Sequence, residues 1–128
     1  MIQINISIVL FKSKKDQVLI SLNNLLKTSL RVTIYLIDNS PCDSLRDLSN
    51  VDSRVLYLFN NANIGYGKGH NIAIRKSIVE NVKYHVVLNP DIIINDNVLE
   101  ILYDFMEENP DIGLVMPKVL NPDGSTQY

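Results

Sequence analysis

The sequence has 128 residues, of which 46% are hydrophobic and 20% are charged, with 12 Lys and Arg against 14 Asp and Glu. This length suits one domain with its own core, and the apolar content excludes a disordered chain. A formal net charge of −2 argues against a nucleic-acid-binding protein, which needs clustered cations against phosphate. A single cysteine, Cys42, excludes an internal disulfide framework and a cysteine-rich zinc site, and fits a reducing compartment.

The N-terminal segment is apolar but lacks the features of an export signal. Residues 1–11 alternate apolar with polar side chains, without the basic start and small-residue cleavage site of a signal peptide. No apolar run in the sequence approaches the roughly 20 residues that span a bilayer. We therefore expect a cytoplasmic protein.

Apolar periodicity predicts strands alternating with helices along the chain. Every second residue from 2 to 10 is apolar, which predicts a strand, and the apolar stripe from 18 to 26 has helical spacing. Further strands are expected at 32–37, 55–59, 84–88 (buried on both faces), 92–94 and 113–120. A helical turn is expected at 45–48, and helices at 70–81 and, capped by residues 95–97, at 98–108.

This alternation over short loops predicts an α/β fold with a mostly parallel, twisted sheet and helices on both faces. Ligands bind such sheets beyond the carboxyl ends of the strands, where the strand order reverses. Candidate site residues are therefore those that directly follow strands, at 11–13, 38–40, 60–69 and 89–91. No repeat or linker divides the chain, so we expect one unit.

Asp38 directly follows the strand predicted at 32–37. An acidic side chain there can accept hydrogen bonds from a base N–H group or a ribose hydroxyl. An equally weighted alternative is that Asp38 begins a turn with Asn39 and Ser40 and bonds its own backbone.

Three glycines, Gly65, Gly67 and Gly69, precede the helix predicted at 70–81. Their pattern is neither the G-x-G-x-x-G dinucleotide fingerprint nor a P-loop. Glycines before a helix expose N–H groups and let an anion approach the helix end, and Lys68 adds a cation. The alternative, slightly favoured for the loop considered alone, is a flexible turn.

Asn89, Pro90 and Asp91 follow the strand predicted at 84–88 and offer oxygen ligands to a hard divalent cation. Because Mg²⁺ takes one or two carboxylates plus substrate phosphates, one Asp is enough for a shared site. The same tripeptide recurs at 109–111 and 121–123, where it marks turns. Only the first copy follows a strand at the ligand-binding edge.

Other reactive side chains are interpreted as structural or solvated. His70 and His85 lie 15 residues apart, without the spacing of a metal pair, and are taken as structural or solvent-facing. The lysines between 12 and 15 are taken as a solvated loop that could lie near a phosphate. Cys42 has no base beside it and is not a candidate nucleophile.

Four segments, in this order and spacing, resemble the donor half of an inverting family 2 glycosyltransferase of the GT-A fold, especially its rhamnosyltransferase-like branch. They are Leu36-Ile37-Asp38-Asn39-Ser40, the stretch 63–74 with its three glycines, Leu88-Asn89-Pro90-Asp91, and the stretch 117–124 that ends in Asn-Pro-Asp-Gly. The resemblance covers essentially the whole chain. It implies the Rossmann-like half of a GT-A fold.

The resemblance also implies a UDP- or dTDP-linked nucleotide-sugar donor. Asp38 would contact its base or ribose, and residues 63–71 would line the nucleotide and diphosphate site. The residues implied in donor binding are Asp38, Asn39, Asn63, Gly65, Gly67, Lys68, Gly69, Asn71 and Asn89. Asp91 stands in the place of the family's D-x-D motif, with Asn89 replacing the first Asp, and is the implied ligand of Mg²⁺ or Mn²⁺. The metal would stabilise the departing nucleoside diphosphate while a carboxylate base activates the acceptor hydroxyl.

The implied acceptor is a saccharide or a lipid-linked saccharide in the synthesis of cell-surface polysaccharide. The net charge and the short apolar runs predict no nucleic-acid partner and no transmembrane segment. The resemblance is compatible with peripheral association at the inner face of the membrane and with a homodimer.

The sequence departs from the family pattern at two places. The first strand of the family runs into an aromatic–Asn pair, whereas this chain has Leu10-Phe11-Lys12-Ser13. The catalytic Asp or Glu of the family lies in an acceptor-binding half that follows the Asn-Pro-Asp-Gly motif. The catalytic residue is therefore unknown and expected beyond Tyr128, and residues 1–128 are expected to be the nucleotide-sugar-binding part of a domain truncated at its C-terminal end.

The absent base leaves a second hypothesis, a non-catalytic module that binds a nucleotide sugar or a partner protein. A sugar nucleotidylyltransferase and a Rossmann dehydrogenase fit less well. Both need a glycine-rich loop after the first strand, and residues 11–15 contain neither Gly nor Arg.

Overall fold

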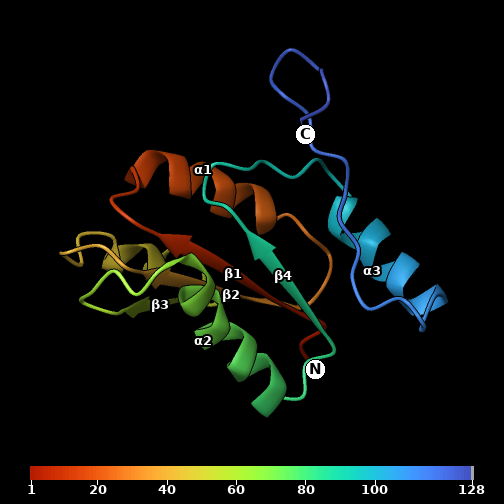
Figure 1. The fold of residues 1–128 in the computed structure, drawn as a ribbon, viewed down its shortest axis with the longest axis horizontal. Coiled ribbons are helices and arrows are strands. Elements are labelled where there is room, and N and C mark those ends of the chain that lie inside the picture. Colours follow the sequence, from red (N-terminus) through yellow and green to blue (C-terminus); the bar gives the residue numbers. More distant parts are fainter. Residues whose placement is uncertain (128) are drawn as a thin grey trace.

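The computed structural model describes residues 1–127 as a four-stranded parallel sheet flanked by helices (Figure 1). The strands are β1 (Ile4–Leu10), β2 (Val32–Asp38), β3 (Val55–Phe59) and β4 (Tyr84–Leu88). The helices are α1 (Lys15–Leu25), the 3₁₀ helix η1 (Arg46–Asn50), α2 (Tyr66–Val79) and α3 (Val98–Glu108). Within residues 1–127, no helix is both long enough and apolar enough to cross a membrane.

The strands lie in the order β3-β2-β1-β4, and every neighbouring pair is parallel. The chain moves outward from β1 through β2 to β3, and α2 then returns it to place β4 on the other side of β1. The strand order therefore reverses between β1 and β4, where Ile8 pairs with Leu88 near the carboxyl ends. Ligands bind at this point in folds of this class.

Helices cover both faces of the sheet, as the sequence predicts (Figure 1). The larger core joins the even-numbered residues of β1 and β2 to apolar residues of α1 and to Leu99 of α3. The smaller core lies under α2 and joins Val9, Tyr35, Ile37 and Ala73. The predicted α/β class is therefore confirmed.

Every residue of β1 is buried, because β1 is a central strand covered on both faces. The buried residues include two polar ones, Asn5 and Ser7. The alternation of apolar and polar residues that predicted this strand therefore separates two faces that are both buried. It does not separate a buried face from an exposed one. The even-numbered apolar side chains point toward α1, and Asn5, Ser7 and Val9 point toward α2.

Helix α2 begins at Tyr66 rather than at the predicted residue 70. Gly65 is its N-cap, with φ 93°, a conformation that glycine adopts without steric cost. Gly67 and Gly69 lie inside the helix, so the predicted glycine loop is largely helical. A Cβ on Gly69 would lie 2.8 Å from Cγ2 of Val9. The close approach of α2 to β1 thus requires this glycine.

Three strand predictions were wrong. β4 is not buried on both faces, because within residues 1–127 it is an edge strand and Val87 is 49% exposed. Residues 92–94 do not form a strand. The segment 113–120 has no regular secondary structure and pairs with no strand of the described chain, apart from one bridge between Leu120 and Thr126. Its apolar side chains gave a strand signal, but a strand also needs a neighbouring backbone edge.

Candidate functional site

An open pocket of about 740 Å³ lies at the carboxyl ends of β1 and β4. The residues that follow β1, including Phe11, Lys12 and Lys14, form one side of it. Asn89, Pro90 and Asp91, which follow β4, form another side, and residues of α1 and Tyr66 of α2 complete the lining. The pocket lies where the strand order reverses, and it brings together residues from three of the four candidate segments, 11–13, 60–69 and 89–91.

Two lysines and two aspartates, Lys12, Lys14, Asp16 and Asp91, bring opposite charges to this pocket. Lys12 and Lys14 are not buried, and both line the pocket. Lys12 adopts a left-handed backbone conformation, with φ 50°, and its N–H group donates to Oγ of Ser40 across 2.8 Å. Lys15, by contrast, pairs with Asp47 outside the pocket lining. All three lysines are exposed, so the predicted solvated loop is confirmed, and a contact of Lys12 or Lys14 with a phosphate stays a prediction.

Asp91 is exposed and lies beside Asn89 and Pro90 in the pocket lining. Residues 1–127 contain no group of three or more His, Cys, Asp or Glu side chains that could hold a metal ion. The described part of the chain therefore has no metal site built from protein ligands alone. A site shared with a diphosphate needs only one or two carboxylates. Asp91, with open space in front of it, fits a metal of that kind.

Tyr66 is a pocket residue that lies within the candidate range 60–69 but was not named individually among the donor-binding residues. Its hydroxyl donates to Oδ1 of Asn89 across 2.7 Å, joining the start of α2 to the end of β4. Its ring also meets the ring of His70 edge to face, with centroids 4.4 Å apart. Partial burial raises the pKa of Tyr66, which keeps the hydroxyl a donor at neutral pH. Its position directly after the N-cap Gly65 is the signal that could have found it.

Asp38 is fully buried at the end of β2. Its Oδ1 accepts a hydrogen bond from the N–H group of Ser40 at 2.9 Å, and its Oδ2 accepts one from the hydroxyl of Tyr57 at 2.5 Å. The turn-forming alternative is therefore confirmed. A direct contact between Asp38 and a nucleotide stays a prediction, and it requires movement that exposes the carboxylate.

Asn39 joins the ends of several elements. Its backbone N–H donates to the carbonyl of Leu10 at 2.8 Å, and its Nδ2 donates to the carbonyl of Gly65 at 3.1 Å. Its Oδ1 accepts a hydrogen bond from Nδ2 of Asn60 at 2.7 Å. Asn39 is buried, and its side chain thereby connects β2, the segment after β3, and the N-cap of α2.

The other predicted residues gather around the start of α2 but do not line the pocket. Oδ1 of Asn63 accepts a hydrogen bond from the N–H group of Gly65 at 3.2 Å. Gly67, Lys68 and Asn71 are exposed on the first turns of the helix, and Gly69 is buried against β1. Of the predicted donor-binding and metal residues, Asn89 and Asp91 lie in the pocket lining, and roles for the rest in binding stay predictions.

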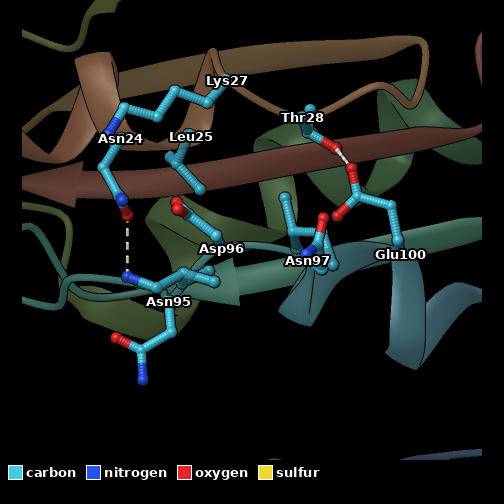
Figure 2. A pocket seen from close by; sticks show the side chains of 10 residues that line it. Asn24, Leu25, Lys27, Thr28, Asn95, Asp96, Asn97 and Glu100 are labelled. Carbon is cyan, nitrogen blue, oxygen red and sulfur yellow. Dashed lines mark hydrogen bonds between the residues drawn. The ribbon is translucent and has the colours of Figure 1, made fainter.

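A second cavity, of about 280 Å³, lies between the end of α1 and the start of α3 (Figure 2). Glu100 accepts a hydrogen bond from Oγ1 of Thr28 at 2.6 Å, and Oδ1 of Asn24 accepts one from the N–H group of Ile94 at 2.8 Å. Asn97 is the N-cap of α3 as predicted, but it is left-handed, with φ 66°, and its side chain caps nothing. This cavity shares no lining residue with the first.

The model of the family described as glycosyl transferase family 2 matches residues 6–128. The chain belongs to this family. A curated relative, the low-salt glycan biosynthesis hexosyltransferase Agl10 of Haloferax volcanii, is 32% identical over 123 residues, which are 94% of this chain and 38% of the relative. The family 2 resemblance seen in the sequence is thereby confirmed. Membership of the rhamnosyltransferase-like branch stays a prediction.

Crystal structures of S. aureus TarS have a similar fold. TarS 1-349 matches with a TM-score of 0.69 and 16% identity over 85% of this chain and 33% of the TarS chain. A second TarS structure matches with a TM-score of 0.71 and 16% identity over 93% of this chain and 24% of that chain. This family 2 chain thus has the α/β fold of a GT-A glycosyltransferase, and it spans 38% or less of the relatives named here.

Proposed function

We propose that this chain is the nucleotide-sugar-binding part of an inverting glycosyltransferase of family 2. The pocket at the ends of β1 and β4 would receive the diphosphate of a UDP- or dTDP-linked sugar. The observation that carries this proposal is the chemistry at the strand-order reversal, where Lys12 and Lys14 line the same open pocket as Asp91. Two cations and two carboxylates, Asp91 and Asp16, suit a diphosphate that shares a metal ion.

Asp91 would hold Mg²⁺ or Mn²⁺ together with the diphosphate. When bound, the metal would act as a Lewis acid that stabilises negative charge on the departing nucleoside diphosphate. Lys12 and Lys14 would attract the phosphates and offset part of their charge. These side chains bind and orient the donor.

In an inverting transfer, the acceptor oxygen bonds to the anomeric carbon while the bond from that carbon to the diphosphate oxygen breaks. A carboxylate base takes the proton of the acceptor hydroxyl, and we assign no residue of this chain as that base. The acceptor would be a saccharide or a lipid-linked saccharide, and the glycan-biosynthesis relative supports this substrate class. A lipid-linked acceptor would be met at the inner face of the membrane, so a cytoplasmic location and peripheral membrane association belong to the proposal.

Thermal unfolding with UDP, dTDP and GDP, each with and without Mn²⁺, tests this proposal. At least one nucleotide is expected to raise the midpoint, and to raise it more with Mn²⁺, because a ligand that binds only the folded state stabilises it. The absence of a shift with all three at millimolar concentration would contradict donor binding. Binding without sugar transfer is the outcome expected of a non-catalytic module.

The repeated Asn-Pro-Asp tripeptide provides a matched control. Asp91→Asn is expected to abolish the Mn²⁺-dependent part of the shift, because Asp91 lines the pocket. Asp111→Asn changes the same residue of the same tripeptide at an exposed position outside the pocket lining. It should leave the shift unchanged. Equal effects of the two variants would refute the assignment of Asp91.

A further inference from the structure

A row of hydrogen-bonded polar side chains runs under α2 between β1 and β4. Oγ of Ser7 lies 2.7 Å from Nδ1 of His70 in α2 and 2.7 Å from Nε2 of His85 in β4. Nδ1 of His85 lies 2.7 Å from Oγ of Ser77. Asn5 donates to that hydroxyl at 3.0 Å. The row joins two strands and one helix that lie far apart in sequence, so it exists only in the folded chain.

The hydrogen atoms of this row can be assigned. The hydroxyl of Ser77 donates to the carbonyl of Ala73 at 3.2 Å, so Nδ1 of His85 donates to Ser77. Nε2 of His85 is then an acceptor for the hydroxyl of Ser7. Because a hydroxyl has a single hydrogen, Nδ1 of His70 must donate to Ser7. Both imidazoles are neutral in this arrangement, in accord with burial, which lowers the pKa of His70 and lowers that of His85 to about 4.

His70 ends the row on the side of the candidate donor pocket. Its side chain is only 3% exposed, and its Nε2 has no hydrogen-bond partner among residues 1–127. Its ring packs edge to face on Tyr66, whose hydroxyl donates to Oδ1 of Asn89. Tyr66 and Asn89 both line the pocket. A continuous path of contacts therefore leads from Ser7 through His70 and Tyr66 to Asn89.

This path fixes the orientation of the amide of Asn89. Tyr66 is 53% exposed, and an exposed tyrosine exchanges between rotamers unless a neighbour restrains its ring. The ring of His70, itself held by Ser7, supplies that restraint. Since Oδ1 of Asn89 accepts the hydrogen of Tyr66, the N–H₂ group of Asn89 is left to donate to a ligand.

We propose that His70 is a positioning residue of the donor site, which acts through Tyr66 to present the amide of Asn89 as a hydrogen-bond donor. Asn89 would then bind an oxygen of the diphosphate or the sugar rather than the metal ion. This inference rests on the proposed function and assigns one contact within the same pocket. The carboxylate that holds the metal would be Asp91 alone.

The variant His70→Leu tests this role. Leucine fills much of the space of the ring, and Ser7 keeps His85 as a partner, so no new buried polar atom is left unpaired. We expect the affinity for the most stabilising of UDP, dTDP and GDP, measured with Mn²⁺, to fall about tenfold, in proportion to the loss of one hydrogen bond. The control is Tyr35→Phe, which keeps the ring and removes only the 2.8 Å hydrogen bond from the Tyr35 hydroxyl to Glu80 under α2, a residue outside the pocket lining. It should bind as the wild type does.

A double-mutant cycle separates positioning from general destabilisation. Tyr66→Phe keeps the ring and loses the hydroxyl, so it should weaken nucleotide binding about as much as His70→Leu. If His70 acts through Tyr66, the double variant is no weaker than either single variant, because the two changes break one path. Additive losses, or wild-type affinity in His70→Leu, would overturn the proposal.

A ligand-free measurement distinguishes failure of this inference from failure of the proposed function. The side-chain amide signals of Asn89 in a ¹H–¹⁵N spectrum should shift in His70→Leu and in Tyr66→Phe, and stay in place in Tyr35→Phe. Unchanged Asn89 signals in His70→Leu overturn the positioning role whether or not a nucleotide binds. A wild-type protein that binds none of the three nucleotides, but shows these signal changes, contradicts the proposed function alone.

Discussion

The hydroxyl of Tyr57, in the middle of β3, donates a hydrogen bond across 2.5 Å to Oδ2 of Asp38, the last residue of the neighbouring strand β2. Asp38 is fully buried, and its Oδ1 accepts a second hydrogen bond, from the N–H group of Ser40. A buried carboxylate is costly unless donors replace the lost water. Tyr57 is the only side chain within residues 1–127 that donates to Asp38, so the position of this strand end depends on it.

We predict that Tyr57→Phe lowers the free energy of unfolding by about 1.5–3 kcal/mol, the range for a hydrogen bond to a charged group. Urea titration at pH 7.5 measures the change. The control is Tyr103→Phe, because Tyr103 is also half-buried and its hydroxyl makes no hydrogen bond to residues 1–127. If the two variants lose the same stability, the buried bond contributes nothing beyond packing.

Two glycines of α2 should respond in opposite ways to the same substitution. Gly69→Ala would place a Cβ 2.8 Å from Cγ2 of Val9, and overpacking of this kind costs about 1–3 kcal/mol. A Cβ on Gly67 would have no neighbouring atom within 4 Å, so Gly67→Ala should raise stability by up to about 1 kcal/mol through helix propensity. Thermal unfolding compares them, and Val9→Ala should restore part of the stability lost in Gly69→Ala. Equal shifts would show that α2 does not pack tightly on β1.

The sequence predicts strands well where apolar runs end abruptly. The runs at 55–59 and 84–88 coincide with β3 and β4, because asparagines follow each run and stop it. The segment 113–120 carries a similar apolar signal but forms no strand in the described chain. Periodicity reports only which side chains are apolar, and Leu114 and Met116 of this segment are 87% and 81% exposed. A strand also requires a free backbone edge beside it, and no local pattern contains that information.

The features of the site also divide into residues that a local sequence rule places and contacts that no local pattern predicts. The places of Asn89 and Asp91 follow from the rule that ligands bind beyond strand ends, and the structure puts both in one pocket. The partners of Ser7 could not be inferred, because His70 and His85 lie 63 and 78 residues away from it. The sequence assigned both histidines to structural or solvent-facing roles, and the structural role is the one observed. Hydrogen bonds across such separations depend on strand order, which a single sequence does not specify.

Removing the charge of Lys14 or of Lys15 should have different effects on nucleotide affinity. Lys14 lines the pocket, whereas Lys15 pairs with Asp47 outside its lining. Lys14→Gln should weaken nucleotide binding about two- to fivefold, which corresponds to about 0.5–1 kcal/mol for one exposed charge interaction. The difference in affinity between the wild type and Lys14→Gln should shrink in high salt, because exposed charges are screened. Lys15→Gln is the control and should leave affinity unchanged, and calorimetric titration at two salt concentrations measures both. A larger loss in Lys15→Gln would place the diphosphate elsewhere.

Stability should fall as the pH drops from about 6.5 toward 4, because the row under α2 needs neutral imidazoles. Burial lowers the pKa of His70, and burial together with the nearby His70 lowers that of His85 to about 4. The unfolded chain therefore binds protons first, near the ordinary histidine pKa of about 6.5. The stabilisation by the neutral rings is complete above that value and is lost progressively below it. Glu80, which Asn5 joins to the far end of the row, is the one carboxylate bonded to it among residues 1–127.

Urea midpoints at pH 7.5, 6 and 5 measure this loss. Carboxylates whose pKa is lowered by pairing, such as Asp52 at about 2 beside Arg54, lose their stabilising effect mainly below pH 5, where the unfolded carboxylates bind protons. Most of the change above pH 5 therefore reports the histidines. His85→Gln removes the more strongly shifted group and should flatten the profile between pH 7.5 and 5. If the variant keeps the full slope, the proton uptake belongs to other groups, and the neutral row does not stabilise the packing of α2 on the sheet.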